Sequence, residues 1–333
     1  MPQPVPAVSR PAPALPALLA ALLTLAAAGC GGGERVTPTV ASQPTDAVAL
    51  LTRHLRDNDL QAFARDAVPP ALRPQLAAAW QAGRTRWPLE ELPFDHKIPG
   101  MLAVLAADKA DTRLRRSFEG QFANAHGEIR AAAKSLGLFG VKFVQTDIAL
   151  SAEERAHYAQ LVAVMSDWGT RAKLGDPKRA RGTIARLTLA ARQSGLRQEA
   201  DFRRYGMDDS LRRLTPVVAA LKESLRAYDL DLDRSLDAMT LSLVSQEGDQ
   251  ARVRMRYPLD GKTIDTVVTV ERIDGRWYLS DFLRHARAAA AVPPGPATPM
   301  PATTPTPAPA DVPPGAPPVV PPTETATTKP TSS

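Results

Sequence analysis

The spacing of hydrophobic positions changes near residue 237, and this change divides the chain into two kinds of structure. Before it, apolar residues recur every three or four positions, as in Val48, Leu51 and Leu55, which is typical of amphipathic helices. After it they alternate with polar residues, as in 251–257, which is typical of strands with one buried face. The pattern predicts an α+β fold, in which a helix-rich region precedes an antiparallel sheet.

Local capping signals place several of the expected helices. Ser151 and Glu154 have the spacing of a capping box, which predicts that a helix begins there. Asp176 followed by Pro177 predicts another helix, because proline is favoured at the first helical position. Gly137 is expected to end a helix. The helices of this region are expected over about 100–107, 111–136, 151–173, 177–194, 199–205 and 209–226, with 139–146 as a short strand.

The alternating region contains four strand patterns separated by turn signals. Glycine follows an acidic residue at Gly248, Gly261 and Gly275, and such pairs are typical of hairpin turns. The four strands are expected over 239–245, 250–257, 263–273 and 277–282. The sequence therefore predicts a four-stranded antiparallel meander.

Composition adds two unusual ends to this folded part. The chain has 333 residues and 32 prolines, of which residues 1–43 hold 7, residues 44–287 hold 10 and residues 288–333 hold 15. A stretch so rich in proline and threonine, with few apolar residues, cannot bury enough surface to offset its ordering entropy. The predicted organisation is a signal peptide at 1–29, a flexible tether at 30–44, a mainly helical region at 45–235, the meander at 236–287 and a disordered tail at 288–333.

The N-terminal segment has the order of an export signal. The apolar run 14–28 would span about 22 Å as a helix, which is less than the roughly 30 Å hydrocarbon core of a bilayer. Small residues then precede Cys30, the single cysteine of the chain. One cysteine excludes an intramolecular disulfide and a four-thiolate zinc site. Cleavage after Ala28 would leave that cysteine as a free thiol.

Ala27-Ala28-Gly29-Cys30 resembles the lipobox of bacterial lipoproteins, although Ala27 stands where that family usually has leucine. The resemblance implies that Cys30 is lipidated and becomes the mature N-terminus. Gly31, in place of the aspartate that retains such proteins in the inner membrane, implies an outer-membrane anchor on the periplasmic face. Acyl chains stabilise membrane binding by about 0.8 kcal/mol per buried CH₂, so the anchor would need no further membrane segment.

A second resemblance concerns the end of the meander. Ile-Asp-Gly-Arg-Trp-Tyr-Leu-Ser-Asp-Phe at 273–282 is similar to the last strands of the NTF2-like (cystatin-like) superfamily, and Leu55–Leu60 is similar to the start of such domains. The resemblance implies a curved sheet packed on helices. It implies no activity, because that fold hosts both enzymes and binding modules.

The sequence predicts no catalytic, cofactor-binding or metal-binding residue. It contains no GxSxG, SxxK, HExxH, Walker or GxGxxG motif. The five histidines are not spaced like metal ligands, so surface or capping positions are expected for them. They are His54, His96, His126, His157 and His285.

Asp229, Asp231 and Asp233 resemble the first ligands of a calcium loop, but Arg234 and Thr240 stand where such a loop needs glycine and glutamate. Their alternation with leucines instead favours a strand-like segment.

Positive charge is concentrated in one helical stretch. The chain carries a net charge of +6, while residues 166–226 hold 14 basic and 7 acidic residues. This stretch is either a solvated face or a contact surface for an anionic partner. An exported protein meets lipid headgroups and cell-wall polymers rather than nucleic acid. The candidate anion-contacting residues are Arg179, Arg181, Arg203, Arg204, Arg212 and Arg213.

Together these patterns predict a lipid-anchored envelope protein that faces the periplasm. Its expected role is a non-catalytic binding or structural module, with the membrane and an envelope protein, an anionic lipid or a cell-wall polymer as partners. The alternative is an NTF2-like domain that binds a small ligand, or acts as an enzyme, in a pocket between the sheet and the helices.

Overall fold

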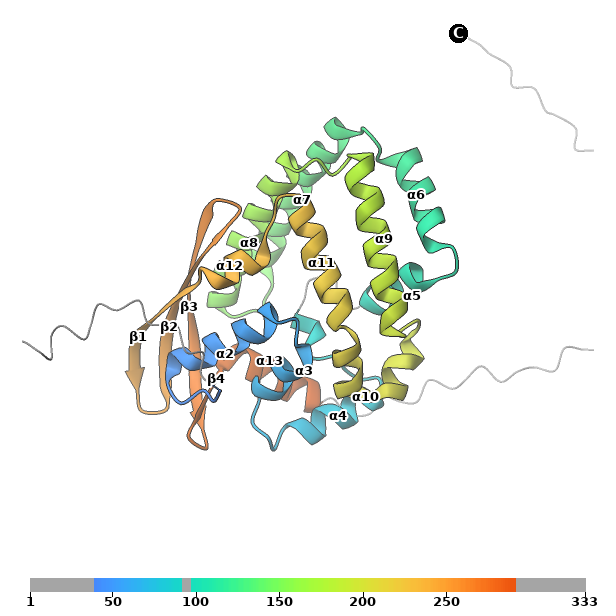
Figure 1. Ribbon diagram of the computed structural model, residues 1–333. Coiled ribbons are helices and arrows are strands. Elements are labelled where there is room, and N and C mark those ends of the chain that lie inside the picture. The colour runs from blue at the N-terminus through green and yellow to red at the C-terminus, as the bar shows by residue number, and fades with distance from the viewer. Residues whose placement is uncertain (1–38, 92–96, 292–333) are drawn as a thin grey trace, which may run out of the picture. The chain divides into compact units, whose positions relative to one another are not determined.

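The α+β fold predicted from the sequence is confirmed by a computed structural model, which describes residues 39–91 and 97–291 (Figure 1). Helices dominate the described residues up to 237, and the sheet follows. The first helices are α2 (Pro44–Arg56), α3 (Leu60–Asp66), α4 (Arg73–Gln81), the 3-10 turn η2 (Leu89–Glu91), α5 (Ile98–Ala106) and α6 (Ala110–Gln121). They are followed by α7 (His126–Thr146), α8 (Ala152–Arg171), α9 (Pro177–Ser194), α10 (Glu199–Arg213), α11 (Thr215–Ala227) and α12 (Leu232–Asp237).

The sheet is the predicted antiparallel meander. Its strands lie in the order β1 (Thr240–Glu247), β2 (Gln250–Leu259), β3 (Lys262–Ile273) and β4 (Arg276–Leu279). Asp260-Gly261 and Asp274-Gly275 connect the last three strands, and all four residues have positive φ angles. Such turns suit the twist of paired strands, which is why these short sequence signals located the hairpins correctly.

The last strand is shorter than the sequence indicated. β4 ends at Leu279, and Ser280–Ala291 forms helix α13 instead of continuing the strand to Phe282. Leu283, Ala286 and Ala289 are buried at the three-residue spacing of a helix. The predicted tail boundary at 288 is therefore wrong by four residues, because 288–291 belong to α13.

The segment expected as a short strand at 139–146 is helical. It forms the second half of α7, which runs through Gly137 and Gly140 without a break. A Cβ atom at Gly137 would lie 2.1 Å from Ser166 Oγ, and one at Gly140 would lie 2.9 Å from Val162 Cγ1. These glycines let α7 approach α8 closely, so they serve packing between helices rather than helix termination.

Two further local expectations need correction. The helices expected at 199–205 and 209–226 are divided elsewhere: α10 continues to Arg213 with a kink at Gly206, where φ is 73°, and α11 begins at Thr215. The segment around Asp231 is not strand-like, because this side chain accepts a hydrogen bond from the backbone N–H of Arg234 and caps α12. Aspartate favours such caps because its short side chain reaches the unpaired backbone donors.

Side chains fill the space between the sheet and its helices. The inner face of the sheet contributes Val253, Ile264 and Val270, which pack with Val48 of α2 and Trp168 of α8. A second apolar core lies among the helices and is made of residues such as Trp80, Trp87, Phe202, Leu211 and Leu283. Within the described part of the chain, no helix is long and apolar enough to cross a bilayer.

Helix α8 connects these parts of the fold. It packs against β3 on one side and against α7 on another, and Figure 1 shows α7 and α8 side by side. Its first turn lies near α13, because Ser151 Oγ donates a hydrogen bond to Asp281 Oδ2 at 3.0 Å. The start of α8 is thus held between elements that are far apart in sequence.

Candidate functional sites

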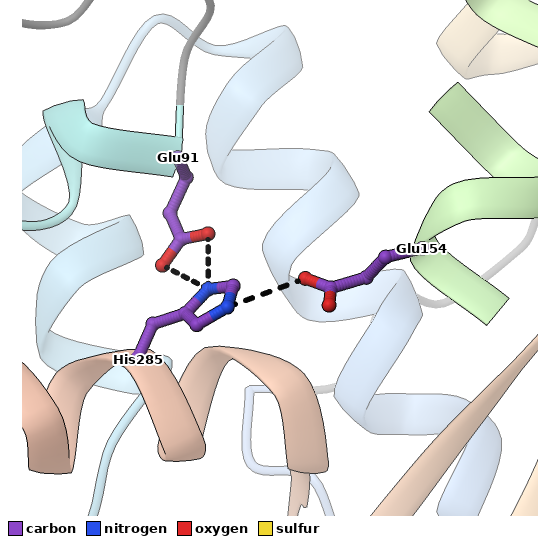
Figure 2. Close-up of side chains that lie close together, drawn as sticks. All are labelled: Glu91, Glu154 and His285. Atoms are coloured by element: carbon purple, nitrogen blue, oxygen red, sulfur yellow. Dashed lines mark hydrogen bonds and ion pairs between the residues drawn. The ribbon is translucent and has the colours of Figure 1, made fainter. Parts of the chain in front are cut away.

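Three side chains from separate elements converge at the start of α8. Glu91 ends η2, Glu154 lies in the first turn of α8 and His285 lies on α13, and Figure 2 shows their side chains pointing toward one another. The His285 Nδ1 atom lies 3.1 and 2.9 Å from the two carboxylate oxygens of Glu91. On the other side of the ring, Nε2 lies 3.5 Å from Glu154 Oε1. These residues are called the glutamate–histidine cluster below.

The local structure around η2 turns Glu91 inward. The neighbouring Glu90 turns to a different set of partners, since its carboxylate accepts hydrogen bonds from the Thr85 hydroxyl and the Arg86 backbone N–H. The indole Nε1–H of buried Trp87 donates to Glu91 Oε1 at 3.0 Å. Adjacent glutamates thus have different environments, and only Glu91 joins the cluster.

The predicted capping box of α8 is present and orients Glu154. Its backbone N–H donates to Ser151 Oγ at 3.1 Å, and the Ser151 backbone N–H donates to Glu154 Oε2 at 2.7 Å. The Arg284 guanidinium also donates to Oε2. Oε1 is buried and has no hydrogen-bond partner among the described residues, and it is the oxygen that faces His285.

Burial and charge shift the titration of this cluster. The Glu91 and Glu154 side chains are 9% and 8% exposed, and that of His285 is 25% exposed. The hydrogen bond to Glu91 raises the pKa of His285, whereas burial raises the pKa of Glu91 against the stabilising effect of His285. Burial and then the nearby charges of Glu91 and Glu154 raise the pKa of Tyr158. The cluster can therefore hold an imidazolium or a metal cation between two carboxylates.

The sequence did not predict this cluster, because Glu91 and His285 are 194 positions apart. Ser151–Glu154 was found as a capping box, but a capping box alone indicates a helix start and no further role. His96 and the lipobox residue Cys30 lie outside the described residues.

The six candidate arginines do not gather in one place. Arg179 lies in the first turn of α9 and binds Asp229, whereas Arg213 donates to the Ser194 carbonyl at the other end of α9. Most of them are also engaged within the protein: Arg204 and Arg212 pair with Asp201 and Asp209, and Arg213 stacks on Tyr205. Within the described residues, only Arg181 and Arg203 of the six make neither an ion pair nor a hydrogen bond.

The aspartates that resemble a calcium loop have basic partners. Asp229 binds Arg179, Asp231 binds Arg226, and Asp233 binds both Arg226 and the buried Lys222. Their charges are thus compensated by neighbouring cations of the same chain.

Helix α7 exposes a row of large apolar side chains. Leu136, Phe139 and Phe143 are 70%, 73% and 69% exposed, and their spacing places them on one side of the helix. We call these three residues the α7 stripe. Lys134 and Lys142 of the same helix form no ion pair with any described residue. Large exposed apolar surface of this kind is typical of a contact surface.

Two hollows open elsewhere on the described part of the chain. A cavity of about 160 Å³ is lined by residues that include Asp66, Arg276 and Trp277. A shallower hollow of about 530 Å³ opens at the surface beside the start of α8 and strands β2 and β3, where Arg254 binds Asp265. Neither is lined by the glutamate–histidine cluster or by the α7 stripe.

Comparison with known proteins identifies no relative: no family model, no curated protein and no solved structure matches the chain. The resemblances to lipoproteins and to the NTF2-like superfamily therefore stay predictions. The functional argument rests on the residues and their geometry.

Proposed function

We propose that this protein is a lipid-anchored envelope protein that acts as a non-catalytic binding module on the periplasmic face of the outer membrane. The export signal and Cys30 support the anchor. The α7 stripe carries the second part of the proposal, because it is a large apolar surface left in solvent. We infer that its partner is the surface of an anionic phospholipid bilayer.

The charges on α7 favour lipid over other partners. After Glu128, the helix has no acidic residue up to its end at Thr146, and Lys134 and Lys142 have no ion-pair partner among the described residues. Phenylalanine and leucine on one side of a helix that also carries lysines are the composition of helices that lie in the headgroup region of anionic membranes. The arginines of 166–226 suit this role less well, because most of them are already engaged within the protein.

The predicted anchor would make a weak second contact effective. The residues between Cys30 and the first described residue, Thr39, span at most about 30 Å when fully extended. A lipidated Cys30 would thus keep the folded part close to the bilayer, at a high effective concentration. The alternative of a small-ligand pocket beneath the sheet has less support, since Val253, Ile264 and Trp168 help to fill that space.

Vesicle flotation tests the contact surface. The predicted mature chain, which begins at residue 30 and so lacks the apolar run 14–28, carries Cys30→Ser and is mixed with vesicles of phosphatidylcholine alone or with phosphatidylglycerol added. Binding is expected only to the anionic vesicles, and Phe139→Ser/Phe143→Ser should reduce it at least about tenfold. The matched control is Leu189→Ser/Leu221→Ser, which removes two leucines that are 55% and 49% exposed on other helices.

Unchanged binding of the phenylalanine double variant would overturn α7 as the contact surface, as would absence of wild-type binding to anionic vesicles. Fatty-acid labelling in a bacterial host tests the anchor separately. Label is expected on the wild type and not on the Cys30→Ser variant, and label that persists in this variant would exclude lipidation of Cys30.

A further inference from the structure

We propose that Glu91, Glu154 and His285 bind one divalent transition-metal ion of the Zn²⁺ type. This site is independent of the α7 stripe and lies on other elements, namely η2, the start of α8 and α13. One imidazole with two carboxylates is a ligand set that suits borderline ions such as Zn²⁺ or Mn²⁺. Ca²⁺ is a poor candidate, because it takes six to eight oxygen ligands.

The three residues have the reach to share one ion. One ligand atom from each lies within 4.8 Å of the others. Bonds of about 2.0–2.2 Å to Zn²⁺ hold ligand atoms about 3–4 Å apart, so the most distant pair of ligand atoms would have to approach by about 1–2 Å to close the site. Side-chain rotation of the two glutamates can provide that movement, because each has several rotatable bonds.

Other groups already orient both carboxylates. Trp87 donates to one oxygen of Glu91, and the Ser151 backbone and Arg284 donate to one oxygen of Glu154. Both oxygens of Glu91, and Oε1 of Glu154, face the imidazole. This is the arrangement that outer-shell hydrogen bonds impose on metal ligands.

The buried Oε1 atom of Glu154 is an independent observation that favours a bound cation. Its side chain is 8% exposed, and Oε1 accepts no hydrogen bond from any described residue. A buried carboxylate oxygen without a donor costs free energy. The 3.5 Å separation from His285 Nε2 is longer than an ordinary hydrogen bond, and a cation bound to Oε1 would compensate this buried oxygen.

The local charge also fits a divalent cation. Asp281 accepts hydrogen bonds from Ser151 and Arg284, so it belongs to the same network. With a neutral imidazole, Glu91, Glu154 and Asp281 contribute three negative charges, and Arg284 contributes one positive charge. The resulting charge of −2 is balanced by one divalent ion, whereas a proton on His285 balances only half of it.

Metal binding is tested on the full-length chain without an affinity tag. Every sample carries Cys30→Ser, which removes the single thiol. After treatment with a chelator, the protein is titrated with Zn²⁺, with Mn²⁺ and, as a negative probe, with Mg²⁺, and affinity and stoichiometry are measured by calorimetry. One Zn²⁺ per chain is expected, and Glu154→Gln and His285→Gln should each weaken binding at least about tenfold.

Glu153→Gln is the matched control, because Glu153 is next in sequence and lies outside the cluster, with its side chain 35% exposed. Its Zn²⁺ affinity should equal that of the parent chain. Circular dichroism of each metal-free variant shows whether it is folded. If a cluster variant unfolds, the Co²⁺ form of the parent chain replaces it as the test, and its spectrum should indicate nitrogen and oxygen ligands.

No Zn²⁺ binding by the parent chain would overturn the proposal. So would equal binding by folded Glu154→Gln and Glu153→Gln variants, or a Co²⁺ form with no bound ion. These results leave the α7 proposal unaffected, since vesicle binding is measured on a surface that contains none of the three ligands.

Discussion

The glutamate–histidine cluster and the α7 stripe reverse the usual distribution of side chains in opposite ways. The cluster places two carboxylates and an imidazole in the interior, and the stripe places two phenylalanines and a leucine in solvent. Both arrangements are costly for an isolated chain unless another group compensates. The comparison teaches that the two regions need different partners: the cluster needs a cation, and the stripe needs an apolar surface.

Helix α8 connects the two regions, because it carries Glu154 of the cluster and packs against α7. Glu154 of its first turn faces His285, while Ser166, three turns further on, packs against Gly137 of α7. The two regions differ in how they are held. Many hydrogen bonds fix the cluster, whereas α7 packs mainly on α8 among the described elements. Changes in the cluster should therefore affect the free energy of unfolding, and changes in the stripe should affect binding.

The largest loss in the free energy of unfolding is expected for Glu154→Leu. This change leaves His285 and Arg284 without a carboxylate that both of them contact, and it also removes half of the α8 capping box. Breaking a buried ion pair by removing one partner costs about 3–5 kcal/mol. Glu153→Leu should change the free energy of unfolding by less than about 0.5 kcal/mol. Urea denaturation of both variants measures the difference, and equal stabilities would show that the cluster contributes nothing to folding.

A somewhat smaller change in stability is expected from the protonation of His157 at low pH. This residue lies one turn after Glu154 and contacts the Tyr257 hydroxyl at 2.7 Å. Burial lowers the pKa of His157 to about 4. Its ring therefore stays neutral in the folded protein below pH 6.5, while the unfolded chain binds a proton, so stability falls as the pH falls from about 6.5 to 4. At about 1.4 kcal/mol per unit, this loss is at most about 3 kcal/mol.

The difference between the wild type and His157→Gln isolates this contribution, because the other titrating groups are common to both proteins. Denaturation at pH 7 and at pH 4.5 should show a smaller loss in the variant. Parallel losses in the two proteins would mean that His157 is accessible to protons in the folded state.

The parts of the fold that the sequence predicted depend on signals between near neighbours. Asp260-Gly261 and Asp274-Gly275 encode their own turns, and Ser151 with Glu154 encodes the start of α8. The predicted helix ends that the structure corrects depend instead on contacts between residues that are far apart in the sequence. Gly137 is read as a helix end unless its contact with Ser166 is known.

The cluster could not be predicted for the same reason. Its three residues come from η2, α8 and α13, and their sequence separations have no relation to a ligand motif. His285 also followed a segment interpreted as a strand, which gave no reason to place it against α8. The sequence does not predict the α7 stripe, because it places Leu136 at the end of one helix and Phe139 and Phe143 on a separate strand, whereas all three belong to α7.

A moderate effect is expected for Gly137→Ala. The added Cβ would lie 2.3 Å from Ser166 Cβ, so α7 must move away from α8. Overpacking of this kind costs about 1–3 kcal/mol. Hydrogen exchange should accelerate in α7 more than in α4, because α7 depends mainly on α8 for its packing. Gly127→Ala is the control in the same helix, since its Cβ would meet no atom within 4 Å. Equal exchange in the two variants would contradict a close α7–α8 contact.

The smallest effect on stability is expected for Phe139→Ser/Phe143→Ser. Because these side chains are 73% and 69% exposed, they bury little surface on folding, and each change should alter the free energy of unfolding by about 0.5 kcal/mol or less. Urea denaturation of the double variant provides the measurement. A loss of several kcal/mol would show that the stripe packs within the chain itself. A small loss, together with loss of vesicle binding, would separate the two regions: the cluster would stabilise the fold, and the stripe would serve only the partner.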